Sequence, residues 1–345
     1  MILWVLRDQY SWFNTFNSVH LGPFIYTLRS ETARMGVLLS MRLRCAPPEG
    51  PAYLPSGLHE ARLFVKRMGS RYLGAIIMEL IPEQPEFVAW VKTLSAGGAR
   101  PVVYFDSADL WPGYTRETLG LHDGYFRFFH DEFSAVNLAL SHLTKAGHRC
   151  IGFPVFESEG YDWSVRRFDT AARIVKTLPG VTLVRAVHRE PVWDVGGAAP
   201  MVDNIATFIQ RLTRLPGEAP DTSPAAVRSN RRRLIERTPS MKSLLDQAIT
   251  ALISMNDRIA YEQYWWCQTA GIPIPRRLSQ ISFDHMPEGD GMPITTIDFG
   301  FSRLGYLAAH AVTGDIKVPA DRMGNIAGIP MLVDRGSVAA PAGRG

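Results

Sequence analysis

The chain has 345 residues, a formal net charge of +4 at pH 7 and a pI near 9.0. Its 46% hydrophobic and 20% charged residues are typical of a globular protein and exclude disorder throughout the chain. Because 345 residues exceed what one hydrophobic core usually serves, we expect two lobes. The mild positive charge permits an acidic partner but does not require one.

The three cysteines, Cys45, Cys150 and Cys267, are few and widely spaced. Their odd number and irregular spacing fit neither a disulfide framework nor a zinc site, and favour reduced thiols in the cytosol. The apolar start at Ile2–Leu6 stops at Arg7 and lacks the features of a signal peptide. No apolar run reaches the roughly 18 residues that indicate a membrane span. We therefore expect a cytoplasmic protein without a membrane partner.

The first part of the chain alternates short apolar runs with segments of helical periodicity. The expected strands are Ile2–Leu6, Val37–Leu43, Gly74–Leu80 and Pro101–Phe105. The expected helices are Phe24–Met35, Leu58–Met68 and Glu86–Leu94. Strands that alternate with helices over short connections predict a parallel sheet covered on both faces.

A second set of the same kind follows. Its expected strands are Cys150–Val155, Val181–Val187, Ala251–Met255 and Leu278–Phe283. Its expected helices are Asp131–Ala146, Ser164–Thr177, Pro200–Leu212 and Asp257–Ala270. Gly147 and Gly271 directly follow two of these helices, as helix stop signals do. Two successive sets predict an α/β protein of two similar doubly wound parallel-sheet lobes.

Two segments depart from this alternation of strands and helices. Residues 214–240 combine prolines with a cluster of arginines and are expected to form a basic surface insertion. The arginines could contact nucleic acid, but a solvated helix face is the favoured interpretation. The tail at residues 334–345 is rich in Gly, Ala and Pro, and its composition predicts disorder.

Polar residues follow several of the predicted strands. Asp8, Asp106 and Asp284 come at or just after strand ends, and Asn256-Asp257 follows another strand. Ligands of open parallel sheets bind beyond the carboxyl ends of the strands, and carboxylates there would accept hydrogen bonds from hydroxyl or amine groups. The alternative is that each Asp caps the next helix, and Asp257 is the strongest candidate for a cap.

Further candidates are an arginine pair and a tryptophan. Arg166 or Arg167, at the start of a predicted helix, could fork onto ligand oxygens, and Trp193 could stack on a sugar or base. Core packing and surface exposure are the alternatives. The cluster His130-Asp131-Glu132 is interpreted as acidic residues that suit a helix N-terminus. The sequence has no Walker loop, GxSxG elbow or HExxH motif, and we expect no catalytic residues, metal or cofactor.

Four stretches in series resemble motifs of the LacI/GalR family of transcriptional repressors. Ser141–Phe153 resembles "HLxxxGHRxIGF", and Ala251–Asp257 resembles "AIFAxND". Ala270–Asp284 resembles "AGxxVPxDxSVxGFDD", and Pro293–Gly305 resembles "PxLTTIxxxxxxxG". Their order and spacing match over roughly residues 1–333, so the chain is similar to the effector-binding region of this family.

The resemblance implies a clamshell like that of periplasmic binding proteins, with three crossings near His130, Ile297 and Gly324. The N-terminal lobe would comprise residues 1–129 and 298–324, and the C-terminal lobe residues 130–297 and 325–333. A sugar or a purine-like effector would bind between the lobes. The ligand contacts that the resemblance implies are Asp8, Asp106, Arg167, Trp193, Asn256 and Asp284.

The chain also departs from the family pattern. Thr170 stands where a glycine would follow the arginine, which leaves the choice between Arg166 and Arg167 open, and His285 replaces the second Asp of "FDD". No helix-turn-helix pattern occurs in this sequence. We expect a homodimeric sensor, not an enzyme, that reaches DNA only through an attached module. The alternatives are a stand-alone solute-binding protein, disfavoured by the missing signal peptide, and an enzyme acting on a sugar or nucleoside.

Overall fold

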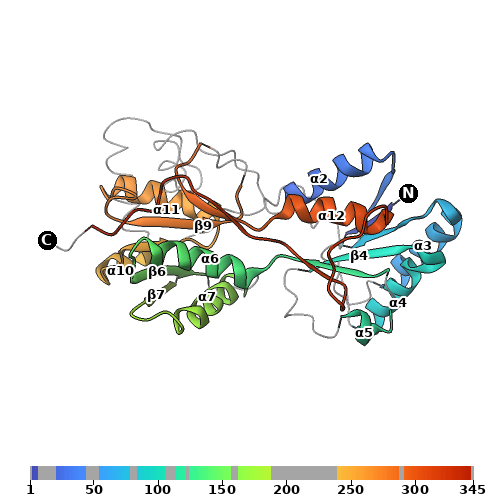
Figure 1. Cartoon of the computed structure of the whole chain (residues 1–345), viewed down its shortest axis with the longest axis horizontal. Helices are drawn as coiled ribbons and strands as arrows, with labels where there is room; N and C mark the ends of the chain where they lie inside the picture. The colour runs from blue at the N-terminus through green and yellow to red at the C-terminus, as the bar shows by residue number, and fades with distance from the viewer. Residues whose placement is uncertain are drawn as a thin grey trace, which may run out of the picture. The chain divides into compact units, whose positions relative to one another are not determined.

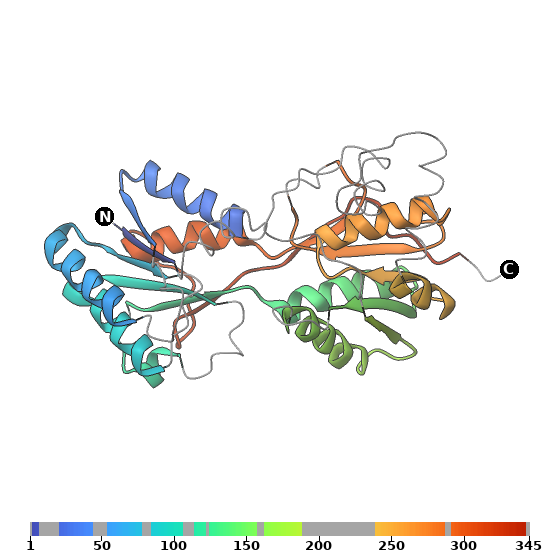
Figure 2. The same cartoon turned by 180° about the vertical axis from the view of Figure 1, so that it is seen from behind.

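The computed structural model describes residues 2–6, 21–43, 54–77, 84–105, 114–121, 124–156, 162–187, 239–286 and 291–342. It divides the chain into two compact units, each built on its own sheet (Figures 1 and 2). Unit one comprises Met1–Asp131 and Gly300–Ile329, and unit two comprises Glu132–Phe299 and Pro330–Gly345. The prediction of an α/β protein with two doubly wound, largely parallel sheets is confirmed.

The sheet of unit one has the strand order β11-β5-β4-β3-β1-β2, with every neighbouring pair parallel. Its strands are β1 (Ile2–Leu6), β2 (Leu39–Leu43), β3 (Gly74–Ile77), β4 (Arg100–Phe105), β5 (Phe126–Phe129) and β11 (Asn325–Ala327). All four residues of β3 are buried, as in a parallel sheet that is covered on both faces.

Helices cover both faces of this sheet (Figures 1 and 2). They are α2 (Leu21–Arg34), α3 (Leu54–Met68), α4 (Gln84–Leu94), α5 (Arg116–Leu119) and α12 (Phe301–Thr313). An apolar core joins α3, α4 and α5 to one face, where Phe87 meets the rings of Tyr114 and Tyr125 edge-on. On the other face, α12 contacts β3, β4 and β5 and packs along α2.

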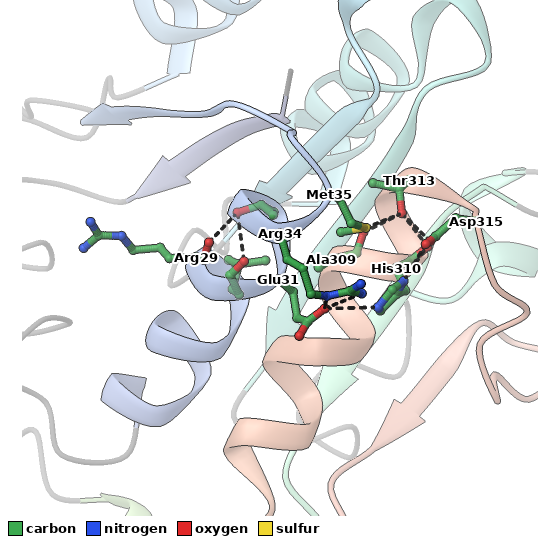
Figure 3. Close-up of polar contacts among 10 residues, drawn as sticks. Arg29, Glu31, Arg34, Met35, Ala309, His310, Thr313 and Asp315 are labelled. Carbon is green, nitrogen blue, oxygen red and sulfur yellow. Dashed lines mark hydrogen bonds and ion pairs between the residues drawn. The ribbon is translucent and has the colours of Figure 1, made fainter.

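The packing of α12 on α2 combines a close backbone approach with buried charges. A Cβ atom at Gly305 would lie 2.2 Å from the carbonyl oxygen of Phe24, so only glycine allows this approach. The His310 ring is 2% exposed, with Nδ1 2.8 Å from Asp315 Oδ1 and Nε2 3.7 Å from Glu31 Oε2 (Figure 3). His310 thus lies between acidic groups on α2 and after α12.

The sheet of unit two has the strand order β12-β10-β9-β8-β6-β7. Its strands are β6 (Cys150–Val155), β7 (Thr182–Val187), β8 (Ala251–Ile253), β9 (Ser279–Phe283), β10 (Thr295–Asp298) and β12 (Met331–Val333). All pairs are parallel except β10 with β12, which is antiparallel. Every residue of β8 and β9 is buried, in keeping with the continuous apolar run of β8 and the mostly apolar or small residues of β9.

Four helices belong to unit two in the described part of the chain: α6 (Glu132–Lys145), α7 (Asp162–Val175), α10 (Pro239–Asp246) and α11 (Asp257–Thr269). Helices α6 and α7 contact each other; α6 also contacts β10 and β12, and α7 contacts β6 and β7. Met241 and Leu244 of α10 share an apolar core with Trp266 and Cys267 of α11. Of the predicted basic insertion, residues 214–238 lie outside the described residues, and Pro239 and Ser240 begin α10.

The third crossing differs from the prediction. Residues 325–329 were expected in the C-terminal lobe, but β11 pairs with β5 through Ile326 and Phe128 in the sheet of unit one. The chain therefore leaves unit one after Ile329, and only β12 joins unit two. Ile326 is 2% exposed, and burying this apolar side chain stabilises β11 in unit one. The boundary between the units therefore lies later in the chain than the resemblance implied.

The prediction of a disordered tail from residue 334 is wrong for residues 334–342. Ser337 is 1% exposed; its Oγ accepts from the Thr295 amide at 2.7 Å, and its carbonyl accepts from the Gln280 amide at 2.9 Å. The Ala339 carbonyl oxygen lies 2.8 Å from Nε2 of the buried His148. These bonds satisfy polar groups of β9 and β10, so a segment of disordered composition is held in place by its partners.

Candidate functional site

The carboxyl ends of neighbouring parallel strands meet at one edge of the sheet in unit two. There β8 runs on into Ser254-Met255-Asn256, and β9 runs on into Asp284-His285. Strands β6, β8, β9 and β10 are consecutive neighbours in the sheet, so the residues that follow them share this edge. Loops and helix N-termini converge at such an edge, which is the usual place for a ligand in an open α/β sheet.

Arg167, on α7, is the central cation of this edge and is 5% exposed. Its Nε lies 2.5 Å from Glu132 Oε1, and its Nη2 donates to Glu132 Oε2 at 3.1 Å. Its Nη1 donates to the carbonyl oxygen of Met255, just beyond β8. Burial alone would lower the pKa of Arg167, but the charge and hydrogen bonds of Glu132, with the charge of Asp284, raise it. Arg167 is thus a permanently charged guanidinium whose position is fixed by Glu132 and Met255.

Three aromatic rings surround the guanidinium. Its carbon lies 4.6 Å from the ring centre of Phe283, 5.1 Å from that of Phe299 and 5.3 Å from that of Trp163. Phe283 and Phe299 are themselves stacked, with ring centres 6.0 Å apart and an interplanar angle of 22°. Cation–π attraction and packing therefore fix the plane of Arg167 and leave it little rotamer freedom.

Asp284 follows β9 in a backbone conformation that few residues adopt. Its φ is 100°, and its amide donates to the Ile297 carbonyl oxygen at 2.9 Å. The side chain is 5% exposed, and its charge acts on both Arg167 and Asp257. Asp tolerates positive φ better than most residues, and such strained positions concentrate at binding sites. His285 also has a positive φ, of 50°, and its Nδ1 lies 3.4 Å from Asp298 Oδ2.

Asn256, and not Asp257, caps α11, so the prediction of Asp257 as the cap is wrong. Asn256, an expected ligand contact, caps α11: its Oδ1 accepts from the Ile259 amide at 2.9 Å. Asp257, the expected cap, is fully buried and accepts hydrogen bonds from Ser282 Oγ, from Thr296 Oγ1 and from the Met286 amide. Burial raises the pKa of Asp257 to about 6, against the effect of its three hydrogen bonds.

Three of the six predicted contacts lie in the described part of unit two. Arg167 and Asp284 are close enough for their charges to interact, and Asn256 follows Met255, whose carbonyl oxygen accepts from Arg167. Arg167 is buried whereas Arg166 is partly exposed, which favours Arg167 as the site arginine. The other predicted contacts lie outside the described residues: Asp8, Asp106 and Trp193.

Sequence reasoning missed Glu132 as a member of this site. It lies in the first turn of α6, where an acidic residue has a sufficient local explanation in the helix dipole. Its actual partner is 35 positions away in the sequence, and no local pattern signals such a contact. Trp163 carried a weak signal, as an aromatic residue directly before the predicted helix Ser164–Thr177 and four positions before Arg167.

This edge of the sheet offers two kinds of group to a ligand. Asp284 supplies carboxylate acceptors, and Arg167 supplies N–H donors held by Glu132 and by aromatic rings. Within the described ranges, no group of three or more His, Cys, Asp or Glu side chains is placed to hold a metal ion. The helices seen in those ranges include none that is long and apolar enough to cross a membrane.

Comparisons with known proteins agree with this fold. The model of the periplasmic binding protein-like domain matches residues 140–338. No curated protein sequence gave a match. Many solved structures are similar, and we describe three of them.

All three are described as LacI-family transcriptional regulators. The regulator from Enterococcus faecium, with bound ribose, has a TM-score of 0.57 and 16% identity, over 99% of this chain and 100% of that one. The regulator from Bifidobacterium animalis subsp. lactis has a TM-score of 0.55 and 18% identity, over 99% and 98%. The regulator from Enterococcus faecalis V583, also with bound ribose, has a TM-score of 0.54 and 15% identity, over 99% and 100%.

Proposed function

The chain belongs to the periplasmic binding protein-like domain family, and from this premise we propose that it is the effector-binding region of a LacI/GalR-type transcriptional regulator. The observation that carries the proposal is that the buried, oriented Arg167 and the buried Asp284, which follows β9, are close enough for their charges to interact. A polyhydroxylated ligand needs both an acceptor and a donor, and these two side chains supply them.

The ligand class is supported by the relatives. Two of the regulators described above hold ribose, and a third similar structure is described as a complex of the regulator CelR with cellobiose. We propose a sugar as the effector, with Asp8, Asp106 and Trp193 as further contacts. An attached DNA-binding module would read out the change in unit arrangement, and a homodimer would match the two-fold symmetry of an operator.

The proposal is tested by ligand-dependent stability. The melting temperature is measured against a panel of ribose, cellobiose, other neutral sugars and purine nucleosides, followed by calorimetric titration of any hit. A ligand at 100 times its dissociation constant should add about 2.7 kcal/mol to the free energy of unfolding. A panel in which no compound binds would refute a sugar or purine effector.

The site is tested with Asp284→Asn, because Asn also tolerates the positive φ at this position. The variant removes the charge and keeps the backbone, and we expect it to weaken binding of the hit at least about tenfold. The matched control is Asp246→Asn, an exposed carboxylate of the same unit whose partner is Lys242. Equal affinity of Asp284→Asn and the wild type would place the site elsewhere.

A further inference from the structure

The guanidinium of Arg167 already holds a carboxylate in the two-pronged geometry that an anionic ligand would require. Glu132 Oε1 and Oε2 lie 2.5 and 3.1 Å from Nε and Nη2, respectively. This fork is the strongest way in which Arg recognises a carboxylate or a phosphate. Because Nη1 also donates to Met255, the N–H bonds left for a ligand are one on each terminal nitrogen.

A second carboxylate helps to neutralise the positive charge of Arg167. Asp284 is 5% exposed and close enough to Arg167 for their charges to interact, so the charges of two carboxylates act on one buried guanidinium. A third acid, Asp257, is close enough to Asp284 for their charges to interact. A phosphate or carboxylate group entering this edge would meet a cation whose charge is already compensated, and it would approach Asp284 as a like charge. Juxtaposed like charges at low exposure cost several kcal/mol.

A neutral hydroxyl meets no such obstacle. It can accept a hydrogen bond from a terminal N–H of Arg167 and donate one to Asp284, and it brings no charge. From these contacts we infer that Glu132 sets the charge preference of the site, so that it takes neutral polyhydroxylated ligands and rejects their phosphorylated or acidic counterparts. This inference rests on the proposed function for its ligand, and Glu132 acts in it as a positioning and specificity residue.

The wild-type protein supplies the first test. Calorimetric titrations compare ribose with ribose 5-phosphate, glucose with glucose 6-phosphate, and glucose with glucuronate, at constant ionic strength. We expect the neutral member of any pair that binds to bind at least about tenfold more tightly. Equal or tighter binding of the anionic member would overturn the inference.

The second test is Glu132→Gln, which keeps the size of the side chain and one acceptor but removes the charge. The change in melting temperature caused by sodium sulfate or sodium phosphate is measured against sodium chloride of equal ionic strength. We expect the divalent anions to stabilise the variant more than the wild type, and the neutral-to-anionic affinity ratio to fall at least about tenfold. An unchanged response to sulfate and an unchanged ratio would each contradict the inference.

The matched control is Glu31→Gln. The Glu31 side chain is 18% exposed, as is that of Glu132, and it also pairs with an arginine, Arg34. It lies in unit one, so its replacement should not change the anion response. If Glu132→Gln does not fold, Glu132→Asp replaces it; the shorter carboxylate weakens the fork, and we expect a smaller change in the same direction.

The two proposals fail in different ways. If no sugar binds in either form, the sugar-binding function is refuted, while the sulfate response of Glu132→Gln still decides the role of Glu132. If neutral sugars bind but the variant discriminates against anions as the wild type does, the proposed function stands and the role of Glu132 is refuted.

Discussion

The carboxyl group of Asp257 offers a direct test of how unit two is held together. It is fully buried and ties the start of α11 to β9 and β10: Thr296 Oγ1 donates to it at 2.7 Å, and the Met286 amide at 2.8 Å. The Ser282 hydroxyl also donates to it. Burial nevertheless raises the pKa of Asp257 from 3.8 to about 6. The hydrogen bonds therefore compensate only part of the cost of burying its charge.

The sign of the pH effect follows from this shift. As pH rises from about 4 to about 6, the unfolded chain releases the Asp257 proton while the folded protein still holds it. The folded state binds more protons over this range, so the contribution of Asp257 to stability falls as pH rises, and it stays low above about pH 6. At about 1.36 kcal/mol per pKa unit, the loss amounts to about 3 kcal/mol.

The perturbation is Asp257→Asn, which keeps the shape of the side chain and removes its titration. The free energy of unfolding is measured by urea titration between pH 4 and pH 8, followed by tryptophan fluorescence, since Trp163, Trp265 and Trp266 belong to unit two. Relative to the wild type, we expect the variant to gain about 2.4 kcal/mol between pH 4 and pH 8, since part of the effect already occurs below pH 4.

The matched control has the opposite sign. A hydrogen bond from the Gly336 amide and another from Thr295 hold the pKa of Asp334 below its usual value. Asp334→Asn should therefore lose stability relative to the wild type as pH rises through the acidic range. A stability difference between Asp257→Asn and the wild type that does not change with pH would refute the reasoning. A loss of stability of Asp257→Asn relative to the wild type as pH rises would also refute it.

Three further variants test other contacts by urea denaturation. Gly305→Ala should lower the free energy of unfolding by about 2–3 kcal/mol, because its Cβ would lie 2.2 Å from the Phe24 carbonyl oxygen. An unchanged stability would contradict this close approach. Ser337→Ala should lose about 1–3 kcal/mol, because it leaves buried backbone groups of the sheet without their partner; wild-type stability would mean that the tail is not anchored there. Arg167→Met should lower the free energy of unfolding by about 3–5 kcal/mol, because it removes the arginine partner of Glu132, and the double variant with Glu132→Gln should recover part of the loss. Additive effects of the two substitutions would argue against the pair.

The elements of the fold were largely predictable because their signals are local. The bounds of β1 and β6 agree with the predicted ranges Ile2–Leu6 and Cys150–Val155. Apolar runs of strand length, helical periodicity and glycines after helices each act within a few residues. The resemblance of four ordered motifs then favoured the same fold that the two sheets display.

The site was predictable in part. Asp284 and Arg167 were singled out because strand ends and helix starts converge in a parallel sheet, and the structure brings their charges together. The roles of Asn256 and Asp257 were not predictable, since both side chains follow the same strand. Backbone rotation at one position decides which of the two turns outward to cap α11 and which is buried among β9, β10 and the following loop.

The sequence by itself thus determined the class of fold, the order of most elements and the residue types at the strand ends. Only the tertiary structure decided the contacts between distant segments. It paired Glu132 with Arg167, placed β11 beside β5 and held residues 334–342 against β9 and β10. The physical reason is that periodicity and capping are properties of neighbouring residues, whereas these contacts depend on burial and on the pairing of polar groups brought together by the whole fold.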